Sequence, residues 1–272
     1  MIDAAATPAP PVSAPNAPLA VVTGASSGIG EALALKLAAA GHDLILVGRD
    51  TERLETVAAQ ISAQGRAAQA RGIDLADSAA REALAAELAA CTPDVLVNNA
   101  GFGAYGPFDT IDPALTQALI ETNIAALARL TAAVLPGMRA RGAGRILNVA
   151  STGAFAPLPF AAAYGASKAF VLSFSEAVNE ELKGSGVTVT ALCPGPTATR
   201  FFRRAGWDGT RLFQGPMATA EHVADCGLKA LMAGRPVEVV GVFNTALVTA
   251  ARLTPRRLVN MATRVMLASR PR

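Results

Sequence analysis

The chain has 272 residues, of which 51% are apolar and 17% are charged, and its formal net charge is +3. This length suits one large domain or two small ones, and the apolar fraction excludes a largely disordered chain. Three widely separated cysteines and two histidines predict neither a disulfide framework nor a metal site, and they argue against catalysis by a histidine base.

Positive charge is concentrated near the C-terminus. Residues 241–272 contain six arginines and no acidic residue, which leaves 18 of the 24 basic residues against all 21 acidic residues. The rest of the chain therefore carries a net charge of −3, and the sequence predicts no nucleic-acid partner. The N-terminus lacks the basic and apolar regions of a secretory signal, and no uncharged apolar run reaches the length of a membrane span. These features predict a cytoplasmic protein.

Residues 1–18 contain five prolines among alanine and serine and show no apolar periodicity, so they predict a disordered leader. From residue 19 onward, short β-branched runs alternate with longer helical patterns. Strands are expected at 19–24, 43–48, 67–75, 94–101, 144–151, 187–195 and 237–242, and helices at 28–41, 50–65, 76–90, 113–140, 161–184 and 219–234. This alternation predicts an α/β protein: a single-domain Rossmann fold over residues 19–242, with a doubly wound, seven-stranded parallel sheet.

The first predicted strand ends in a glycine-rich turn that leads directly into a helix. Glycines let the backbone turn tightly and approach a pyrophosphate, whose charge is met by amide N–H groups and by the positive end of the helix. Glycine spacing alone is a weak signal, since such turns often only close a loop. The strand before the turn and the helix after it favour dinucleotide binding. The predicted cofactor contacts here are Gly24, Ser26, Ser27, Gly28, Ile29 and Gly30.

The second predicted strand ends at Gly48, where NAD-binding sites usually place a carboxylate for the ribose hydroxyls. Arg49 follows instead, and a guanidinium can bind the 2′-phosphate of NADP(H) through two charge-assisted hydrogen bonds. NADP(H) is therefore favoured over NAD(H). In the alternative interpretation, Arg49 and Arg53 are solvated charges at the start of a helix, and Asp50 neutralises Arg49.

Tyr164 and Lys168 lie four residues apart at the start of a predicted helix, so the phenol and the ammonium share one face. A neighbouring cation favours the ionised form of a phenol, which brings its pKa closer to the neutral range used in proton transfer. Ser151 ends the strand that precedes this helix, at the edge of the sheet where ligands collect. These three side chains are candidate catalytic residues.

Together, these motifs make the chain resemble the classical short-chain dehydrogenase/reductase family over residues 19 to about 240. The resemblance implies that Tyr164 protonates the carbonyl oxygen during reduction and that Ser151 orients this oxygen. Lys168 would lower the pKa of the tyrosine and hold the nicotinamide ribose, and Asn123 would position a water that relays protons. Further cofactor contacts are implied at Asp74, Leu75, Asn98, Ala100, Gly101, Pro194, Gly195, Thr197 and Thr199.

Three stretches that bound the substrate pocket in this family contain most of the aromatic residues: residues 102–108, 152–163 and 200–217. They favour an apolar or bulky carbonyl substrate, such as a ketone, an aldehyde or a 3-oxoacyl compound. In the alternative interpretation, the rings are core or subunit contacts. The resemblance also implies a homodimer or a homotetramer.

Residues 243–272 form a basic amphipathic C-terminal extension that departs from the compact family pattern. It would pack on its own domain or on a second subunit, or it would lie on anionic lipid or on the carrier of a long-chain substrate. One side of its predicted helix holds Leu258, Ala262, Val265 and Met266, and another holds Arg257, Asn260 and Arg264.

The sequence thus predicts an NADPH-dependent carbonyl reductase that also oxidises alcohols in the reverse direction. Two alternatives remain open. A sugar-nucleotide epimerase of the related extended family is disfavoured by the shorter glycine spacing and by the small region after the sixth strand. A non-catalytic dinucleotide sensor or scaffold would have no chemical reason to keep Ser151, Tyr164 and Lys168 together.

Overall fold

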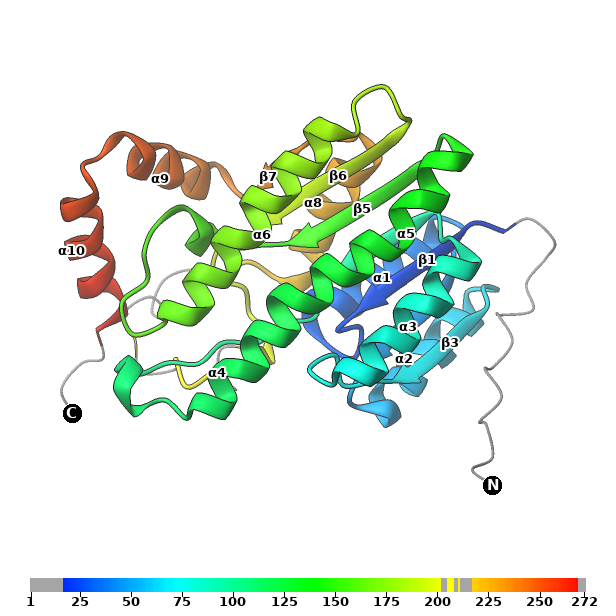
Figure 1. Cartoon of the computed structure of the whole chain (residues 1–272), viewed down its shortest axis with the longest axis horizontal. Helices are drawn as coiled ribbons and strands as arrows, with labels where there is room; N and C mark the ends of the chain where they lie inside the picture. The colour runs from blue at the N-terminus through cyan, green and yellow to red at the C-terminus, as the bar shows by residue number, and fades with distance from the viewer. Residues whose placement is uncertain (1–16, 202–204, 208–209, 211–216, 269–272) are drawn as a thin grey trace.

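The computed structural model describes residues 17–201, 205–207, 210 and 217–268, with a seven-stranded parallel sheet at its centre (Figure 1). The strand order is β3-β2-β1-β4-β5-β6-β7. The strands are β1 (Leu19–Thr23), β2 (Asp43–Gly48), β3 (Ala68–Gly72), β4 (Val95–Asn98), β5 (Gly144–Val149), β6 (Val187–Cys193) and β7 (Val237–Val239). The predicted doubly wound parallel sheet is confirmed.

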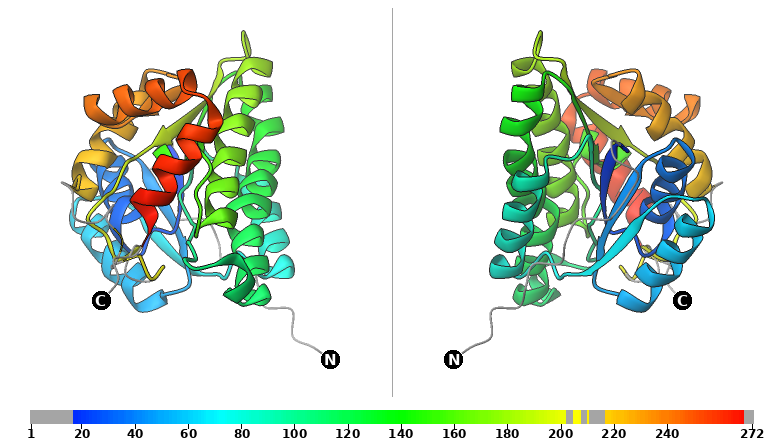
Figure 2. Two further views of the ribbon diagram at one scale, coloured as in Figure 1. Left: turned by 90° about the vertical axis from the view of Figure 1, so that its left-hand side faces the viewer. Right: turned by 90° about the vertical axis from the view of Figure 1, so that its right-hand side faces the viewer.

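Helices cover both faces of the sheet (Figure 2). One face packs against α1 (Gly28–Ala39), α2 (Thr51–Ala63) and α8 (Ala220–Met232). The other face packs against α3 (Ser78–Cys91), α5 (Leu127–Arg141) and α6 (Ala162–Glu181). Because successive residues of a strand point to opposite faces, Val21 and Val22 belong to different core clusters, and both are fully buried. This two-sided burial explains the nearly continuous apolar runs of β1, β2 and β4.

Polar side chains that accept hydrogen bonds from the backbone mark the end of β3 and the starts of several helices. β3 ends at Gly72 rather than at residue 75, because the Asp74 carboxylate accepts from the Ala76 N–H and starts a turn. The side chains of Asp50, Asp77 and Thr219 cap α2, α3 and α8. Each such cap contributes about 1 kcal/mol to helix stability.

The order of the strands places a crevice above the middle of the sheet. The chain winds outward from β1 to β3, returns to β4 beside β1, and then winds to β7 on the other side. At this switch point the loops that leave β1 and β4 diverge to opposite faces, and ligands of such sheets bind between them. The glycine-rich turn after β1 and the Asn99–Gly101 segment after β4 both lie there.

The helix predicted at 113–140 is one helical run with a π-helical turn inside it. It consists of α4 (Pro113–Ile120), the π-helical turn Glu121–Ala126 and α5. In the described part of the chain, this run alone has the length and apolar composition of a membrane span. It contacts α3, α6 and the sheet, and its residues Leu130 and Val134 are in the core, as in a core helix.

The C-terminal extension forms two helices at one end of the molecule, α9 (Val242–Leu253) and α10 (Arg256–Leu267) (Figure 1). α9 contacts β7 and the short helix η3 (Thr152–Phe155). The Arg252 guanidinium lies 5.0 Å from the centroid of the Phe155 ring. Within these two helices, the buried side chains are Val248, Val259 and Leu267. The extension therefore lies against the domain through few contacts.

Candidate active site

A cavity of about 1740 Å³ lies at the carboxyl ends of the central strands and extends to the C-terminal helices. It brings together most of the residues that the sequence predicts as a site. Those that line it are Gly24, Ser26, Ser27, Gly28, Ile29, Arg49, Asp74, Leu75, Ala100, Gly101, Ser151, Tyr164, Lys168, Pro194, Gly195, Thr197 and Thr199. Three predicted site residues, Gly30, Asn98 and Asn123, do not line the cavity.

The glycine-rich turn, residues 24–30, leaves a hollow that side chains would fill, and we call this turn the glycine cradle. Gly24 (φ +66°) and Gly28 (φ +62°) adopt the left-handed conformation that favours glycine. A Cβ atom at Gly28 would lie 3.0 Å from Thr199 Cγ2, across the cavity edge. Ser27, the residue that precedes α1, makes no side-chain capping hydrogen bond, so the first amides of α1 can serve an anion. This cradle fits the pyrophosphate of a dinucleotide.

Gly30 packs beneath this turn instead of contacting the cofactor space. A Cβ atom there would lie 2.3 Å from the carbonyl oxygen of Gly24, so only glycine fits. Asn98 also does not line the cavity, and its cofactor contact stays a prediction. Its buried Nδ2 donates to Thr131 Oγ1 at 3.1 Å and to Asn148 Oδ1 at 2.9 Å, and it thereby ties β4 to β5 and α5. The next residue, Asn99, faces the cavity and donates to the Thr23 carbonyl oxygen at 2.9 Å.

Arg49 stands at the cavity edge with its guanidinium 66% exposed and 3.9 Å from the Asp74 carboxylate. Asp50 does not neutralise it, because its carboxylate accepts from the Arg53 N–H at 3.2 Å and caps α2. Arg53 is not a solvated charge either. Its Nε donates to the Ser26 carbonyl oxygen at 2.8 Å, and its Nη2 lies 3.7 Å from a Glu31 carboxylate oxygen. Arg49 is thus the cation left facing the space beside the glycine-rich turn.

Ser151, Tyr164 and Lys168 all line this cavity. Tyr164 and Lys168 are both buried near the start of α6, and the Ser151 side chain forms a hydrogen bond with the Tyr164 side chain. Lys168 Nζ donates to the Val149 carbonyl oxygen at 2.7 Å and lies 5.9 Å from the centroid of the Tyr164 ring. The end of β5 therefore holds the ammonium beside the phenol.

Burial shifts the pKa values of this pair in opposite directions. It raises the pKa of Tyr164 to about 12, against a smaller lowering by the Ser151 hydrogen bond. It lowers the pKa of Lys168 to about 8. The sequence predicts the opposite direction for the tyrosine, but the loss of hydration on burial is the largest cause of the shift. The phenol thus keeps its proton at neutral pH and can donate it.

Asn123 lies behind Gly101, in the π-helical turn. Its Oδ1 accepts from the Phe102 N–H at 3.1 Å, and its Nδ2 donates to the Phe102 carbonyl oxygen and to Ser167 Oγ, both at 3.0 Å. A Cβ atom at Gly101 would lie 3.0 Å from Asn123 Oδ1 and 3.6 Å from Lys168 Nζ. The side chain thus fixes the loop after β4 beside the lysine. A water relay through Asn123 stays a prediction.

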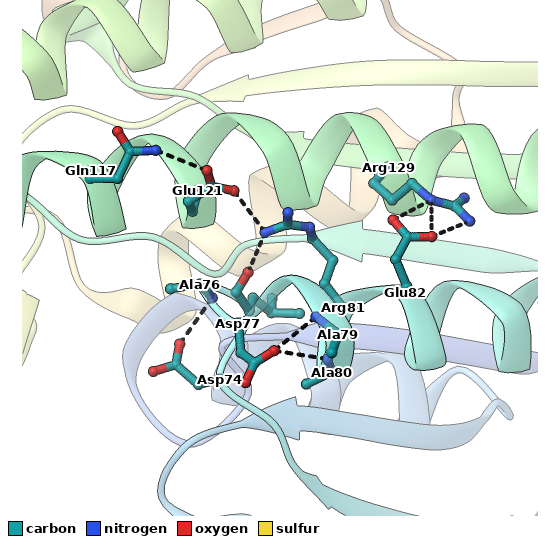
Figure 3. Close-up of polar contacts among 11 residues, drawn as sticks. Asp74, Ala76, Asp77, Ala79, Ala80, Arg81, Glu82, Gln117, Glu121 and Arg129 are labelled. Carbon is teal, nitrogen blue, oxygen red and sulfur yellow. Dashed lines mark hydrogen bonds and ion pairs between the residues drawn. The ribbon is translucent and has the colours of Figure 1, made fainter.

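Sequence reasoning missed an ion-pair network that connects this turn to the loop after β3 (Figure 3). Arg81 of α3 is buried, and its Nη1 donates to the Leu75 carbonyl oxygen at 3.0 Å. The same nitrogen lies 3.0 Å from a carboxylate oxygen of Glu121, the first residue of the π-helical turn. Gln117 Nε2 donates to the other Glu121 oxygen at 2.9 Å. Arg81 thus joins the Asp74–Leu75 wall of the cavity to the turn that carries Asn123.

The C-terminal helices supply a wall of the cavity that the sequence did not predict. α10 contributes Leu258, Val259, Ala262, Thr263, Met266 and Leu267, and α9 contributes Asn244, Leu247, Val248 and Ala251 among others. The Tyr105 hydroxyl donates to the Leu267 carbonyl oxygen. Val265, which the sequence places on the same side as Leu258, does not line the cavity. The amphipathic pattern signals a buried face but cannot say against what it packs.

Aromatic rings from the predicted substrate stretches surround Tyr164. The ring centroids of Phe201 and Trp207 lie 5.5 Å and 5.3 Å from that of Tyr164. Trp207 and Leu267 are buried in one apolar cluster with Tyr164. Residues 202–204, 208–209 and 211–216 of the third stretch lie outside the described residues. Among the described residues, the side chains packed around Tyr164 are therefore mostly apolar.

The parallel sheet, the glycine cradle and the Ser-Tyr-Lys group define a dinucleotide-binding oxidoreductase. The family model of short chain dehydrogenases matches residues 18–208, and the chain belongs to this family. Similarity to a structure of a short-chain dehydrogenase from Sphingobium yanoikuyae in complex with NADPH covers 90% of this chain and 95% of that one, at 35% identity and a TM-score of 0.80.

Two further relatives extend the comparison. The bulky-bulky ketone specific alcohol dehydrogenase from Comamonas testosteroni is 29% identical, with a TM-score of 0.75 over 88% of this chain and 93% of that one. The very-long-chain 3-oxoacyl-CoA reductase of Bos taurus is 35% identical over 70% of this chain and 63% of its own length. NADPH complexes among the similar structures agree with the exposed Arg49, and NADP(H) is the favoured cofactor.

Proposed function

We propose that this oxidoreductase reduces the carbonyl group of a ketone, an aldehyde or a 3-oxoacyl compound, with Tyr164 as the general acid. The observation that carries the proposal is the placement of Ser151, Tyr164 and Lys168 in the same cavity that the glycine cradle lines. When bound, NADPH supplies a hydride to the carbonyl carbon, and negative charge grows on the oxygen. That oxygen needs a proton and a fixed hydrogen bond.

The site residues divide this work. Tyr164 holds a proton at neutral pH and gives it to the substrate oxygen, and the Ser151 hydroxyl orients that oxygen. Lys168, held at the end of β5, is close enough to stabilise the phenolate after the proton leaves. The implied contacts of Lys168 with the nicotinamide ribose, and of Pro194, Gly195, Thr197 and Thr199 with the nicotinamide, fit their place in the cavity wall.

The substrate is proposed to be apolar or bulky beside its carbonyl group. Phe201, Trp207 and the inner faces of α9 and α10 support this, since they offer apolar surface within the same cavity as Tyr164. The names of two relatives agree with it, because one is a bulky-bulky ketone specific alcohol dehydrogenase and the other a very-long-chain 3-oxoacyl-CoA reductase.

Replacement of Tyr164 by phenylalanine tests the acid. Tyr164→Phe should bind NADPH normally but lose turnover by about 10²–10⁴-fold or more, because the proton donor is removed while the ring remains. A spectrophotometric screen of ketones, aldehydes and 3-oxoacyl thioesters that follows NADPH absorbance supplies the substrate. Tyr105→Phe is the matched control, since its hydroxyl binds the Leu267 carbonyl oxygen. Near-normal turnover in Tyr164→Phe would refute the proposal.

Three organisational proposals accompany this function. Residues 19–242 form the dinucleotide-binding and catalytic domain, and residues 243–272 form an extension that closes one side of its cavity, of which residues 269–272 lie outside the described part. The predicted leader, residues 1–18, is described only at residues 17 and 18. The protein works in the cytoplasm as a homodimer or homotetramer, and sedimentation equilibrium measures the subunit number.

A further inference from the structure

The outer surface of the C-terminal helices exposes apolar side chains that the cavity does not use. Val242 and Leu253 of α9 are 89% and 83% exposed, and Met261 and Val265 of α10 are 62% and 50% exposed. None of these four residues lines the cavity. We call these four residues the outer face. Single exposed apolar residues are ordinary, but these four lie within 24 helical residues at one end of the molecule.

The helical spacing of α10 explains how this face arises. Leu258, Ala262 and Met266, at spacings of four residues, point into the cavity. Met261 and Val265 form a second line beside them, also four residues apart, which the cavity wall does not cover. The apolar face of α10 is therefore wider than its contact with the domain. A helix that only closed the cavity would not need the second line.

Arginines border the outer face. Arg257 lies one helical turn before Met261, and Arg264 lies one turn before the end of the helix, three residues after Met261. Arg252 and Arg256 lie at the junction of α9 and α10. All four are exposed, and in the described part of the chain no carboxylate forms an ion pair with any of them. Long cationic side chains beside apolar ones suit an interface between charged head groups and acyl chains.

We propose that the outer face docks on an anionic lipid bilayer. Leu253, Met261 and Val265 would enter the boundary between head groups and acyl chains, and Arg256, Arg257 and Arg264 would bind lipid phosphates, whereas Arg252 contacts Phe155. The rest of the chain has a net charge of −3, so electrostatic attraction would orient this end toward the membrane. The opposite edge of α10 lines the cavity, so docking would bring an apolar substrate pool beside it.

Two other occupants fit the surface less well. A second copy of the same face would oppose arginine to arginine, because residues 241–272 contain no acidic residue. An acidic acyl-carrier domain would match the charge, but the four apolar side chains project by half or more of their surface. Polar recognition of a carrier gives no reason for that degree of apolar exposure. An anionic bilayer accounts for both the exposed apolar side chains and the arginines beside them.

Co-sedimentation of the full chain with lipid vesicles tests the proposal. The protein should sediment with phosphatidylcholine vesicles that contain phosphatidylglycerol, and not with phosphatidylcholine alone. Raised salt should weaken this binding by screening the arginines. The double variant Met261→Asp/Val265→Asp should partition into vesicles about tenfold less, or more weakly still, because two apolar side chains that would enter the bilayer become charged. Met232→Asp, an exposed methionine on α8, is the matched control and should bind vesicles normally.

A second variant separates charge from apolar contact. Arg257→Glu/Arg264→Glu should abolish the preference for phosphatidylglycerol, and both double variants should reduce a small soluble ketone as the wild type does, which shows that they fold. Equal binding by wild type and both variants, or no binding to any vesicle, would overturn the proposal. So would capture of an acidic acyl-carrier domain, or self-association through this face, without vesicle binding. Vesicle binding requires no turnover, so its failure leaves the proposed reductase activity untouched.

Discussion

Desolvation and hydrogen bonding to Ser151 compete in setting the pKa of Tyr164, and desolvation is the larger effect. The buried phenol has a pKa of about 12, and the buried ammonium of Lys168 has a pKa of about 8. At neutral pH a lysine with this pKa is still mostly charged, so it can stabilise a phenolate that forms beside it. Tyr164, with its raised pKa, stays protonated at neutral pH. A general acid in carbonyl reduction must be protonated before the reaction.

The choice between the two nicotinamide dinucleotides depends on Arg49. Arg49→Ala should weaken NADPH binding by about tenfold or more, since a hydrogen bond to a charged group contributes about 1.5–3 kcal/mol. NADH binding should change little, or improve slightly, because NADH lacks the 2′-phosphate. Fluorescence titration of both cofactors measures the two dissociation constants. An equal effect on both would show that Arg49 does not contact the 2′-phosphate.

The buried lysine should also be visible in the pH dependence of stability. Burial lowers the pKa of Lys168 from 10.5 to about 8 in the folded protein. Above pH 8 the unfolded chain therefore binds more protons at this residue than the folded protein does, so its contribution to stability rises with pH. Burial raises the pKa of Cys193 from 9.0 to about 12, which acts in the opposite direction, but only above pH 9.

The range between pH 8, the pKa of Lys168 in the folded protein, and pH 9, the ordinary pKa of a cysteine, isolates the contribution of the lysine from that of Cys193. From pH 8 to pH 9, the free energy of unfolding of the wild type should rise by about 1 kcal/mol relative to that of Lys168→Met. Urea denaturation at the two pH values measures this difference. Parallel pH profiles for the two proteins would mean that the lysine is hydrated in the folded protein.

At the scale of elements, two turns with unusual geometry position the site. The cradle after β1 needs glycine at Gly24, Gly28 and Gly30 for conformation or space. The π-helical turn between α4 and α5 directs Asn123 toward the loop after β4. Local sequence explains the first turn, because its residues are contiguous. The second is bound to α3 by Arg81, which lies 40 residues from Glu121 in the chain.

Two arginine pairs near these elements, both seen in Figure 3, should differ in their contribution to stability. Arg81→Met should lower the free energy of unfolding by about 1–3 kcal/mol, because it leaves the Leu75 carbonyl and Glu121 without their partner. Arg129→Met breaks an exposed pair with Glu82 and should lower the free energy of unfolding much less than Arg81→Met does. Urea denaturation of both variants makes the comparison. Similar losses of unfolding free energy in the two variants would show that the contacts of Arg81 with Leu75 and Glu121 contribute no more than an exposed ion pair.

At the scale of the whole molecule, the cavity belongs to both the domain and the extension. The glycine cradle, Arg49 and Tyr164 are all contributed by residues 19–242, whereas α9 and α10 reach the same cavity from the far end of the chain. The extension and the glycine cradle line the same cavity. We therefore expect cofactor binding and substrate selection to be separable.

Removal of residues 254–272 should separate these parts experimentally. The truncated protein should bind NADPH within about threefold of the wild type, because the residues of the glycine cradle and Arg49 are all retained. Its kcat/KM for a bulky apolar ketone should fall by about tenfold or more, since burial of one large apolar side chain contributes about 1.5–3 kcal/mol. A small ketone should lose much less. Loss of NADPH binding would mean that α10 supports the domain itself.

The sequence by itself determined the alternation of strands and helices, the glycine cradle and the Tyr164–Lys168 pair. These features depend on local patterns: two-sided burial of strands, close approach of backbone at glycine, and the four-residue spacing of a helix. Most of the predicted cofactor contacts line the cavity for this reason, because each follows directly after a strand at the same sheet edge.

Only the tertiary structure decided the rest. Asn98 binds a neighbouring strand while Asn99 faces the cavity, a choice of one residue that depends on pairing across the sheet. The direction of the Tyr164 pKa shift depends on burial by distant residues such as Trp207. The place of α10 against the cavity could not be read from its amphipathic pattern, because that pattern specifies an apolar face but not the surface that it meets.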